Sequence, residues 1–441
     1  MSNIYLVSLG CDKNRVDGEV MIGTLRNAGY AVVHDPAAAK AIIINTCGFI
    51  RDAVQESIDL ILELSEHKTD GECQALIIVG CMAQRYRAEI KKSIPEADVI
   101  VGVGEYEGIA DVVAGLIGPG DNETQSAELS RLAARCDDIT PHIAYVKIAE
   151  GCDNCCTYCT IPSIRGAYKS RAMEDIVSEC KQLVAAGARE LVLVAQDTAL
   201  YGTDIYGEKK LTALMREIAQ TSGATWIRLM YAYPEHITDE LIDTMAELPQ
   251  ICKYIDMPIQ HSEDAILQPM GRKGSNQALI QLIERLRRRM PGIVIRTTLI
   301  VGFPGESTSI FARMHRFVKQ IQFGRLGVFP YSQEEGTPAA KMANQLSDSV
   351  KLKRVEHMMY TQQQIHFEKQ AQYVGRTLPV MLDFRNEDGE YIGRTQWDAY
   401  EVDTIVTFSS EDDTLIQGEI YPVRILGAQQ YDLRGRHEPT K

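Results

Sequence analysis

The sequence predicts an α/β protein with three parts: an N-terminal doubly wound parallel sheet, a central partial, TIM-like β/α barrel and a small C-terminal antiparallel β-barrel. Short apolar runs alternate with helix-like stretches near the start of the chain, and a second, longer series of the same alternation follows. The last part changes to short β-like runs separated by Gly and acidic turns. We expect domains at residues 1–117, 138–372 and 373–441, with a linker at 118–137.

The first part contains three strand-like runs, "NIYLVSLG", "AIIINT" and "ALIIVG". Each run is continuously apolar rather than alternating, which is typical of parallel strands that are covered on both faces. Residues 15–28 and 50–66, which lie between these runs, have the apolar spacing of helices. This β-α-β-α-β order predicts a doubly wound sheet.

A break follows at "GPGDN", and the apolar periodicity then lapses until the central part begins. Six apolar runs there alternate with helix-like segments: "IAYVKIAE", "ELVLVAQ", "WIRLMYA", "YIDMPIQ", "IRTTLIVGF" and "RLGVFPYS". Six strand-helix steps predict an open or partial barrel rather than a complete eight-stranded one. A helical stretch at about 347–372 then leads to "TLPVMLDF", "DTIVTFS" and "IYPVRILGA", which predict the small barrel.

The composition of the chain indicates the cellular compartment of the protein and the kind of partner that it binds. The chain has 441 residues, 45% of them hydrophobic, and no apolar run approaches the roughly 18 residues that span a bilayer. We therefore expect a cytoplasmic protein with no membrane contact, in which the 11 cysteines serve metal binding or catalysis rather than disulfides. A net charge of −14 disfavours general nucleic-acid affinity and suits a basic partner.

Three cysteines occupy the same position in consecutive β-α repeats. Cys11, Cys47 and Cys81 each follow a predicted strand, at separations of 36 and 34 residues. The carboxyl ends of parallel strands lie along one edge, where open α/β sheets bind ligands, so we expect the three thiols to meet there. A small buried cysteine at a strand end is the alternative for any one of them, but the shared register favours a common site.

Four cysteines lie close together in "GCDNCCTYC", just after the first strand of the predicted barrel. Cys152, Cys156 and Cys159 form C-x3-C-x2-C, whereas all four, with Cys155, form two abutting C-x2-C pairs. Four thiolates would close a zinc site, but zinc motifs usually separate their pairs by about a dozen residues or more. Three thiolates on a short loop favour an iron-sulfur cluster that leaves one iron open for a substrate or cofactor.

Weaker candidates for cofactor contact lie at other strand ends of the barrel. Gln196 and Asp197 end the second strand, and a turn cap is the alternative for the aspartate. Arg296 lies on a strand, where it can pair with a cofactor carboxylate or form a structural ion pair. Gly302 lies after the same strand, although a glycine turn also explains it. For His261 and the run "RLRRR" we favour a hydrogen-bonded structural histidine and a solvated helix face.

Several motifs resemble one known family. "EGCDNCCTYC" resembles the cluster loop of radical S-adenosylmethionine enzymes, with Cys152, Cys156 and Cys159 on the matching positions and Tyr158 as the aromatic before the last ligand. "SLGCDKNRVDGE", "NTCGFIRDAVQES" and "GCMAQRY" are similar to the N-terminal domain of methylthiotransferases. "IPSIRGAYKSR", "VGFPGE" and "YSQEEGTPAA" are similar to the RimO branch of that family, and the tail resembles a TRAM domain.

This resemblance implies two [4Fe-4S] clusters, one on Cys152, Cys156 and Cys159 and an auxiliary one on Cys11, Cys47 and Cys81. It implies that S-adenosyl-L-methionine binds at the open iron of the first cluster. The implied reaction converts a C-H bond at the β-carbon of an aspartate in ribosomal protein S12 of the small subunit to C-S-CH3. A low-potential electron donor and a sulfur donor are implied partners, and direct nucleic-acid binding is not required.

Two other functions stay open at this point. A methylthiotransferase that acts on transfer RNA is the first, but the last domain carries seven Lys and Arg against thirteen Asp and Glu, which is poor for binding a phosphate backbone. The second is a zinc-stabilised binding protein without catalysis. It would be colourless, whereas the enzyme would be brown, oxygen-sensitive and hold about eight irons.

Overall fold

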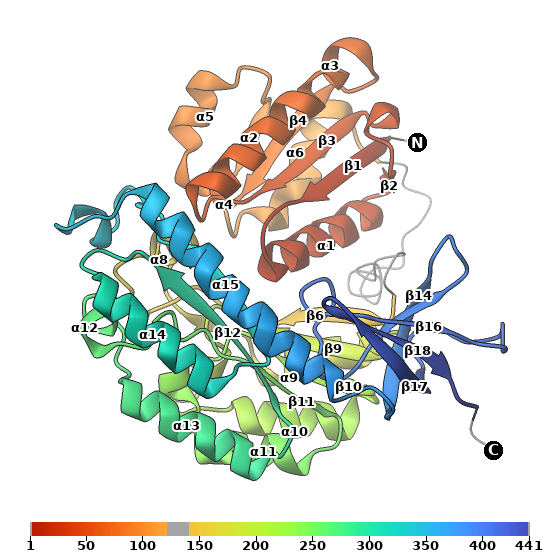
Figure 1. Ribbon diagram of the computed structural model, residues 1–441. Helices are drawn as coiled ribbons and strands as arrows, with labels where there is room; N and C mark the ends of the chain where they lie inside the picture. The colour runs from red at the N-terminus through yellow and green to blue at the C-terminus, as the bar shows by residue number, and fades with distance from the viewer. Residues whose placement is uncertain (1, 121–140, 440–441) are drawn as a thin grey trace.

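The computed structural model describes residues 2–120 and 141–439, which form an N-terminal α/β domain, a central β/α domain and a C-terminal β-barrel (Figure 1). Residues 121–137 of the predicted linker lie outside the described residues.

The N-terminal sheet is fully parallel, in the order β2-β1-β3-β4-β5. Every residue of β3 and β4 is buried, because an apolar cluster covers each face of the sheet. The two short edge strands, β2 and β5, were not predicted from the sequence, since they span only two and three half-buried or buried residues. The strands are β1 (Asn3–Ser8), β2 (Ala31–Val32), β3 (Ala41–Thr46), β4 (Ala75–Gly80) and β5 (Val99–Val101). The helices are α1 (Asp12–Asn27), α2 (Arg51–Ser65), α3 (His67–Asp70), α4 (Cys81–Arg85), α5 (Arg87–Ser93) and α6 (Ile109–Ile117).

The central domain has one six-stranded parallel sheet in which neighbours in sequence are neighbours in space, in the order β13-β12-β11-β10-β9-β6. The predicted open barrel is therefore confirmed. Its strands are β6 (Ile143–Lys147), β9 (Glu190–Val194), β10 (Trp226–Leu229), β11 (Ile251–Asp256), β12 (Val294–Val301) and β13 (Arg325–Pro330). The helices are α8 (Ile161–Arg165), α9 (Met173–Ala185), α10 (Leu211–Thr221), α11 (Asp239–Glu247), α12 (Asp264–Leu267), α13 (Asn276–Arg289) and α14 (Thr308–Ile321). A small antiparallel pair, β7 (Ala149–Glu150) and β8 (Lys169–Ser170), flanks the cysteine loop.

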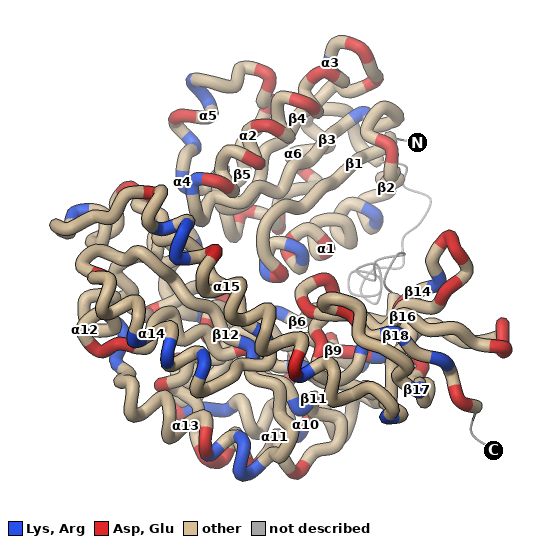
Figure 2. Tube along the Cα trace, in the orientation of Figure 1, with Lys and Arg blue, Asp and Glu red and all other residues tan. Residues whose placement is uncertain are grey.

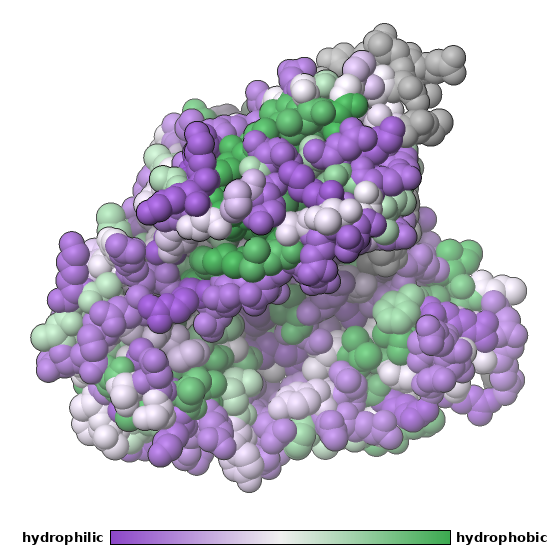
Figure 3. Space-filling view, turned by 90° about the horizontal axis from the view of Figure 1, so that it is seen from above, coloured by the Kyte–Doolittle hydropathy of each residue, from purple (hydrophilic) through white to green (hydrophobic). Residues whose placement is uncertain are grey.

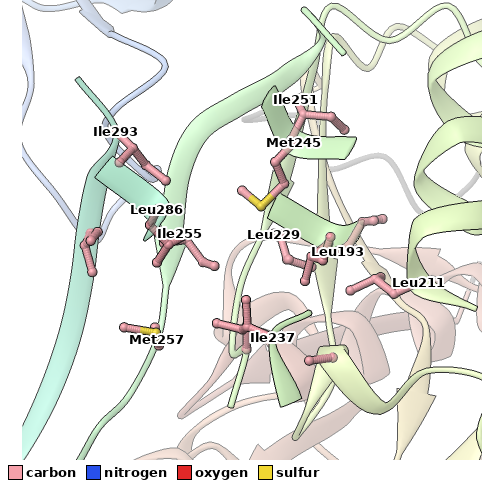
Figure 4. Close-up of a cluster of buried hydrophobic side chains, with 14 of the residues drawn as sticks. Leu193, Leu211, Leu229, Ile237, Met245, Ile251, Ile255, Met257, Leu286 and Ile293 are labelled. Carbon is pink, nitrogen blue, oxygen red and sulfur yellow. The ribbon is translucent and has the colours of Figure 1, made fainter. Parts of the chain in front are cut away.

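The main core lies between this sheet and its helices. Figure 4 shows Leu193, Leu229 and Ile255 of neighbouring strands packed with Met245 of α11 and Leu286 of α13, and all five are fully buried. Successive strand residues point to opposite faces, so the alternate positions line the inside of the barrel.

The C-terminal domain closes part of the inner face. Tyr145, Trp226 and Tyr254 of the sheet share an apolar cluster with Met381 and Ala399 of the small barrel. The carboxyl ends of the strands, by contrast, face the N-terminal domain through α1, which packs against β6.

Helix α15 (Asp348–Ala371) leads to the closed C-terminal barrel, β14-β15-β16-β18-β17. All of its strand pairs are antiparallel except β16 with β18, which are parallel. The small barrel is thus confirmed, but the sequence did not reveal β15 and β18, which are short and carry charged residues. The strands are β14 (Thr377–Arg385), β15 (Tyr391–Arg394), β16 (Val406–Ser409), β17 (Ile420–Gln429) and β18 (Asp432–His437).

Seen from the side of the N-terminal domain, hydrophilic residues cover most of the surface and apolar residues gather in smaller patches (Figure 3). None of the helices within the described residues combines the length and the apolar character that crossing a membrane requires.

Candidate active site

Three cysteines meet at the carboxyl edge of the N-terminal sheet. Cys11 lies at the start of α1, Cys47 directly follows β3, and Cys81 is the first residue of α4. Burial, with smaller contributions from the nearby Cys11 and Cys47 thiols, raises the pKa of the Cys81 thiol to about 11. The structure thus brings these three thiols together, and we call them the auxiliary triad.

Each cysteine of the auxiliary triad has a glycine neighbour at which a side chain does not fit. Gly10 has a φ of +90°, and a Cβ built on it would lie 2.9 Å from the Sγ of Cys47. A Cβ on Gly48 would lie 2.8 Å from the carbonyl oxygen of Cys81, and Gly80 has a φ of +95°. The chain segments at this edge can approach so closely because Gly occupies these positions.

In the barrel loop, three of the four cysteines interact and the fourth lies apart. Burial, with smaller contributions from Cys156 and Cys152, raises the pKa of the Cys159 thiol to about 12. The Sγ of Cys156 also lies 2.9 Å from the hydroxyl of Tyr233. Cys155 is exposed, and its thiol donates to a backbone carbonyl of its own loop at 3.7 Å. We call Cys152, Cys156 and Cys159 the barrel triad.

The segment after α12 holds the barrel loop in place. The Thr157 N–H donates to the carbonyl of Met270 at 3.0 Å, and its hydroxyl donates to the carbonyl of Pro269 at 2.7 Å. Gly271 has a φ of +76°, and a Cβ there would lie 2.5 Å from the carbonyl oxygen of Cys155. The loop conformation therefore depends on a tight backbone contact that only Gly permits.

Neither triad is arranged for a single metal ion. Within residues 2–120 and 141–439, no three His, Cys, Asp or Glu side chains are grouped so that they could hold one ion. A zinc ion draws its ligands to about 2.0–2.3 Å from one point, whereas the separate irons of a cluster hold their thiolates further apart. Three thiols are the number of cysteine ligands that a [4Fe-4S] cluster with one open iron requires, and the assignment of the two triads to clusters stays a prediction.

A buried charge network joins the barrel domain to α1. Arg165, at the end of α8, donates to Asn14 at 2.6 Å and to Asp17 at 3.1 Å. The same guanidinium donates to Glu150 at 2.9 Å. Lys147 donates to Asp17 at 2.5 Å and to Glu150 at 2.6 Å. Two cations and two carboxylates thus neutralise one another at the interface between the two triads.

The charge of Arg165 acts on both the carboxylates and the thiols. Burial opposes the ionisation of Glu150, but Lys147 and Arg165 together outweigh burial and lower its pKa to about 2. The Cys81 thiol donates to Asn14 at 3.6 Å, and Arg165 lowers the pKa of this thiol against the larger effect of burial. A cation from the barrel domain therefore favours the thiolate form in the N-terminal domain.

A second contact at this interface involves a strained tyrosine. Tyr231 has a φ of +58°, which is rare for residues other than Gly. Its hydroxyl donates to Asp12 at 2.8 Å, and the ammonium of Lys13 lies 3.2 Å from its ring centroid. Its backbone N–H donates to Asp256, the last residue of β11. The first turn of α1, next to Cys11, thus lies against the carboxyl ends of the barrel strands.

Two of the predicted cofactor contacts lie near the barrel triad. Burial, with a smaller contribution from Cys156, raises the pKa of Tyr158 well above its ordinary value. Gln196 donates to Glu150 at 2.7 Å, while its Oε1 is buried without a hydrogen-bond partner in the described part of the chain. Their role in cofactor binding stays a prediction.

Asp197 is engaged within the protein. It is fully buried, accepts a hydrogen bond from Asn154 at 3.1 Å and lies 2.6 Å from the Nδ1 of His236. It also caps a short 3-10 helix by accepting from the N–H of Ala199. The turn-cap interpretation is therefore confirmed for this residue, and cofactor contact stays a prediction.

Arg296 and Gly302 also have structural partners. Arg296 pairs with Asp256 at 2.9 Å, as in the ion-pair alternative. Gly302 has a φ of +77°, its N–H donates to Glu306, and a Cβ on it would lie 2.4 Å from the side chain of Lys351. These contacts explain both residues without a cofactor, and their assignment as cofactor contacts stays a prediction.

Both structural interpretations of the remaining polar motifs are confirmed. His261 is fully buried and its Nε2 lies 3.3 Å from Glu306. In the run "RLRRR", Arg285 and Arg289 pair with carboxylates of α11, whereas Leu286 faces the core.

The residues that link the two triads were missed in the sequence. Arg165, Asp17 and Glu150 lie in motifs used only for the family resemblance, and their roles depend on contacts between domains. An available signal was the run "AYVKIAE", in which Lys147 and Glu150 interrupt an otherwise apolar strand end just before the cysteine loop.

Known families match each part of the chain. Residues 3–102 match the model of Uncharacterized protein family UPF0004, residues 146–318 that of the Radical SAM superfamily, and residues 374–437 that of the TRAM domain. Among solved structures, the radical S-adenosylmethionine methyltransferase TsrM from Kitasatospora setae is similar, with a TM-score of 0.54 and 15% identity over 77% of this chain and 74% of that chain. This likeness shows a shared fold.

Full-length relatives are also found. The chain is 44% identical over 440 residues to "Ribosomal protein uS12 methylthiotransferase RimO" of Lachnoclostridium phytofermentans, covering 99% of this chain and 100% of the relative. It is 45% identical over 443 residues to the protein of the same name from Clostridioides difficile, covering 99% and 98%. The superfamily match implies S-adenosyl-L-methionine and a [4Fe-4S] cluster. The chain therefore belongs to the RimO family of ribosomal protein uS12 methylthiotransferases and is a radical SAM methylthiotransferase.

Proposed function

We propose that this enzyme adds a methylthio group to the β-carbon of an aspartate in ribosomal protein uS12. The observation that carries the proposal is the joining of the two cysteine triads across one interface, where Arg165 of the barrel domain contacts Asp17 of α1. The full-length similarity to proteins named for uS12 methylthiolation supports the choice of substrate.

The donor sets fit two clusters and S-adenosyl-L-methionine. We propose that Cys152, Cys156 and Cys159 hold one [4Fe-4S] cluster and that Cys11, Cys47 and Cys81 hold the other. Both sets leave one iron of a cubane without a cysteine ligand. When bound, these groups supply electrons, the radical that removes hydrogen, and the sulfur and methyl that are transferred.

Buried oxygens at the barrel mouth provide acceptors for a cofactor. Among the described residues, the Oε1 atoms of Gln196 and Gln260 are buried and have no hydrogen-bond partner. A buried polar atom without a partner is unfavourable, so these atoms indicate a missing donor. The amino group and ribose hydroxyls of S-adenosyl-L-methionine are donors of this kind. We propose that Gln196 and Tyr158 lie against the cofactor, with Asp197, Arg296 and Gly302 supporting the mouth through their neighbours.

The residues between the two triads compensate one another's charges and fix the relative orientation of the two cysteine sites. Arg165 and Lys147 compensate Asp17 and Glu150, so that the interface stays closed around buried charges. The hydroxyl of Tyr233 lies 2.9 Å from the Sγ of Cys156 and fixes the position of this sulfur in the loop. We propose that these contacts hold the two triads on either side of one substrate position.

Charge supports a protein substrate over a nucleic acid. Acidic residues gather on the two loops that project from the C-terminal barrel, residues 386–390 and 410–414 (Figure 2). A negative surface repels a phosphate backbone and attracts a basic ribosomal protein. A low-potential electron donor and a sulfur donor complete the proposed partners. We also propose that the enzyme acts in the cytoplasm. Its three domains are proposed to span residues 1–117, 138–372 and 373–441.

The test is an anaerobic incubation of the reduced, iron-reconstituted protein with S-adenosyl-L-methionine and either purified uS12 or transfer RNA. Mass spectrometry is expected to find an added methylthio group on an aspartate of uS12 and none on the RNA. Cys81→Ser is expected to abolish this product, while Cys73→Ser, which removes another buried cysteine of the same domain, is expected to retain it. Modification of the RNA alone would show that the substrate is wrong.

A further inference from the structure

Lys13 is a buried cation whose partner is an aromatic ring. It lies in the first turn of α1, two residues after Cys11, and is only 7% exposed. Its Nζ lies 3.2 Å from the ring centroid of Tyr231. Among the residues that the structure describes, no hydrogen bond or ion pair to this ammonium is present.

The carboxylates of this interface are engaged with other residues. Asp12 accepts from the hydroxyl of Tyr231 at 2.8 Å. Asp256 accepts from Arg296 at 2.9 Å and from the N–H of Tyr231 at 3.1 Å. Asp17, one turn further along α1, is held by Arg165 and Lys147. Each of these carboxylates therefore already has a cation or a hydrogen-bond donor as its partner. None of them is paired with the ammonium of Lys13.

A lysine that is almost entirely buried and has no anion beside its ammonium is unfavourable. Proteins bury lysines only rarely unless they are paired, because the charge loses its hydration. The face of Tyr231 compensates part of that loss and fixes the direction of the side chain, but a ring does not replace a carboxylate. A lysine ammonium that is positioned in this way without an anion indicates that a bound ligand supplies the anion.

The position of Lys13 indicates which ligand this is. Its side chain runs from the helix that starts at Cys11 to Tyr231, which follows β10 at the carboxyl edge of the barrel sheet. A substrate that receives sulfur from the auxiliary site and loses hydrogen at the barrel site has to lie between these two elements.

We propose that Lys13 binds the side-chain carboxylate of the substrate aspartate, an inference that rests on the proposed function. The carboxyl carbon of aspartate is bonded directly to the β-carbon that reacts. Anchoring the carboxylate on Lys13 therefore holds the β C-H bond between the two triads. It also explains why an acidic residue is selected, since a neutral side chain brings no anion to the Lys13 ammonium.

The same chemistry could serve a second carboxylate, that of the methionine part of S-adenosyl-L-methionine. Lys13 belongs to the N-terminal domain and lies two residues from Cys11 of the auxiliary triad, whereas the cofactor site is expected at the barrel triad. This placement favours the substrate carboxylate, and the experiment separates the two.

The test compares uS12 with its variant that has Asn at the target position, using the reconstituted wild-type protein, Lys13→Met and Lys13→Arg. Binding of each uS12 form is measured without turnover, together with iron content and S-adenosyl-L-methionine cleavage in the absence of uS12. In Lys13→Met, affinity for the Asp form is expected to fall at least about tenfold, while affinity for the Asn form is unchanged. Lys13→Arg is expected to recover part of the preference for Asp.

Lys351→Met is the matched control. Lys351 is 5% exposed and its ammonium also lies over a tyrosine, 5.5 Å from the ring centroid of Tyr331, but it has a carboxylate partner in Asp348 at 2.9 Å. This variant is expected to keep the wild-type ratio of Asp to Asn affinities, even if its stability falls.

Three results would overturn the inference. If Lys13→Met has the wild-type ratio of affinities for the Asp and Asn forms of uS12, the lysine does not bind the substrate carboxylate. Loss of cofactor cleavage without uS12 would assign Lys13 to the cofactor carboxylate, and loss of iron would assign it a structural role. If the wild-type protein itself modifies only RNA, the proposed function fails before any variant is compared, so the two failures are distinct.

Discussion

Arg165 and Asp17 form a two-point contact in which both terminal nitrogens of the guanidinium donate to the same carboxylate oxygen, at 3.2 and 3.1 Å. Arg165 lies six residues after Cys159, and Asp17 lies six residues after Cys11. The contact therefore ties the segment behind the barrel triad to the helix that starts at the auxiliary triad. Both side chains are almost fully buried, which makes their charges strongly dependent on each other.

Replacing Arg165 with Met is expected to lower the free energy of unfolding by about 3–5 kcal/mol, because Asp17 and Glu150 lose a buried partner. Urea denaturation of the purified protein measures the change. Arg385→Met is the control, since its pair with Asp413 is exposed and is expected to contribute less than about 1 kcal/mol. Equal effects of the two substitutions would contradict the role given to the network.

Glu150 predicts a specific pH dependence. Its pKa is about 2 in the folded protein against 4.5 for the free side chain, so its charge adds stability that is full above pH 4.5 and is lost as the pH falls toward 2. The difference in unfolding free energy between the wild type and Glu150→Gln is therefore expected to be constant above about pH 5 and to shrink below it. Denaturation curves at several pH values measure it, and a difference that grows on acidification would refute the assignment.

Gly10→Ala is expected to disrupt the auxiliary site selectively. The added Cβ would lie 2.9 Å from the Sγ of Cys47, and the φ of +90° disfavours alanine. Iron content after reconstitution is expected to fall by roughly half, while cleavage of S-adenosyl-L-methionine at the barrel continues. Gly108→Ala, where a Cβ meets nothing within 4 Å, is expected to keep all the iron. Loss of barrel activity together with the iron would show that the two sites are not independent.

Cys155 and its neighbour Cys156 are expected to behave differently. Cys155→Ser is expected to retain iron and cofactor cleavage, because its thiol is exposed and lies apart from the barrel triad. Cys156→Ser is expected to lose both, because its Sγ is buried beside Tyr233 and interacts with Cys152. Iron analysis and the visible absorption spectrum of the two variants decide the matter. A colourless Cys155→Ser protein would mean that the wrong triplet was chosen.

Much of the site could be predicted because it depends on local pattern. The three cysteines of the auxiliary triad follow strands whose apolar runs are unambiguous, and parallel strands place such residues at one edge. The spacing of "GCDNCCTYC" favours a three-cysteine cluster site over a zinc site, and the choice of Cys152, Cys156 and Cys159 stays a prediction. Short or charged strands such as β5 and β18 were missed, because neither length nor periodicity separates them from loops.

The sequence by itself determined the three-part fold, the two cysteine sets and the family, because apolar periodicity and residue spacing act over short distances along the chain. Only the tertiary structure decided that Arg165 reaches Asp17, that Lys147 lies between two carboxylates and that Lys13 points at Tyr231. The contacts of Asp17 with Arg165 and Lys147 and of Lys13 with Tyr231 join residues more than a hundred positions apart, whereas Lys147 and Glu150 are near neighbours in the chain. Their charges are stable in the interior only because the packing of one domain on another supplies each partner, and no local pattern records that packing.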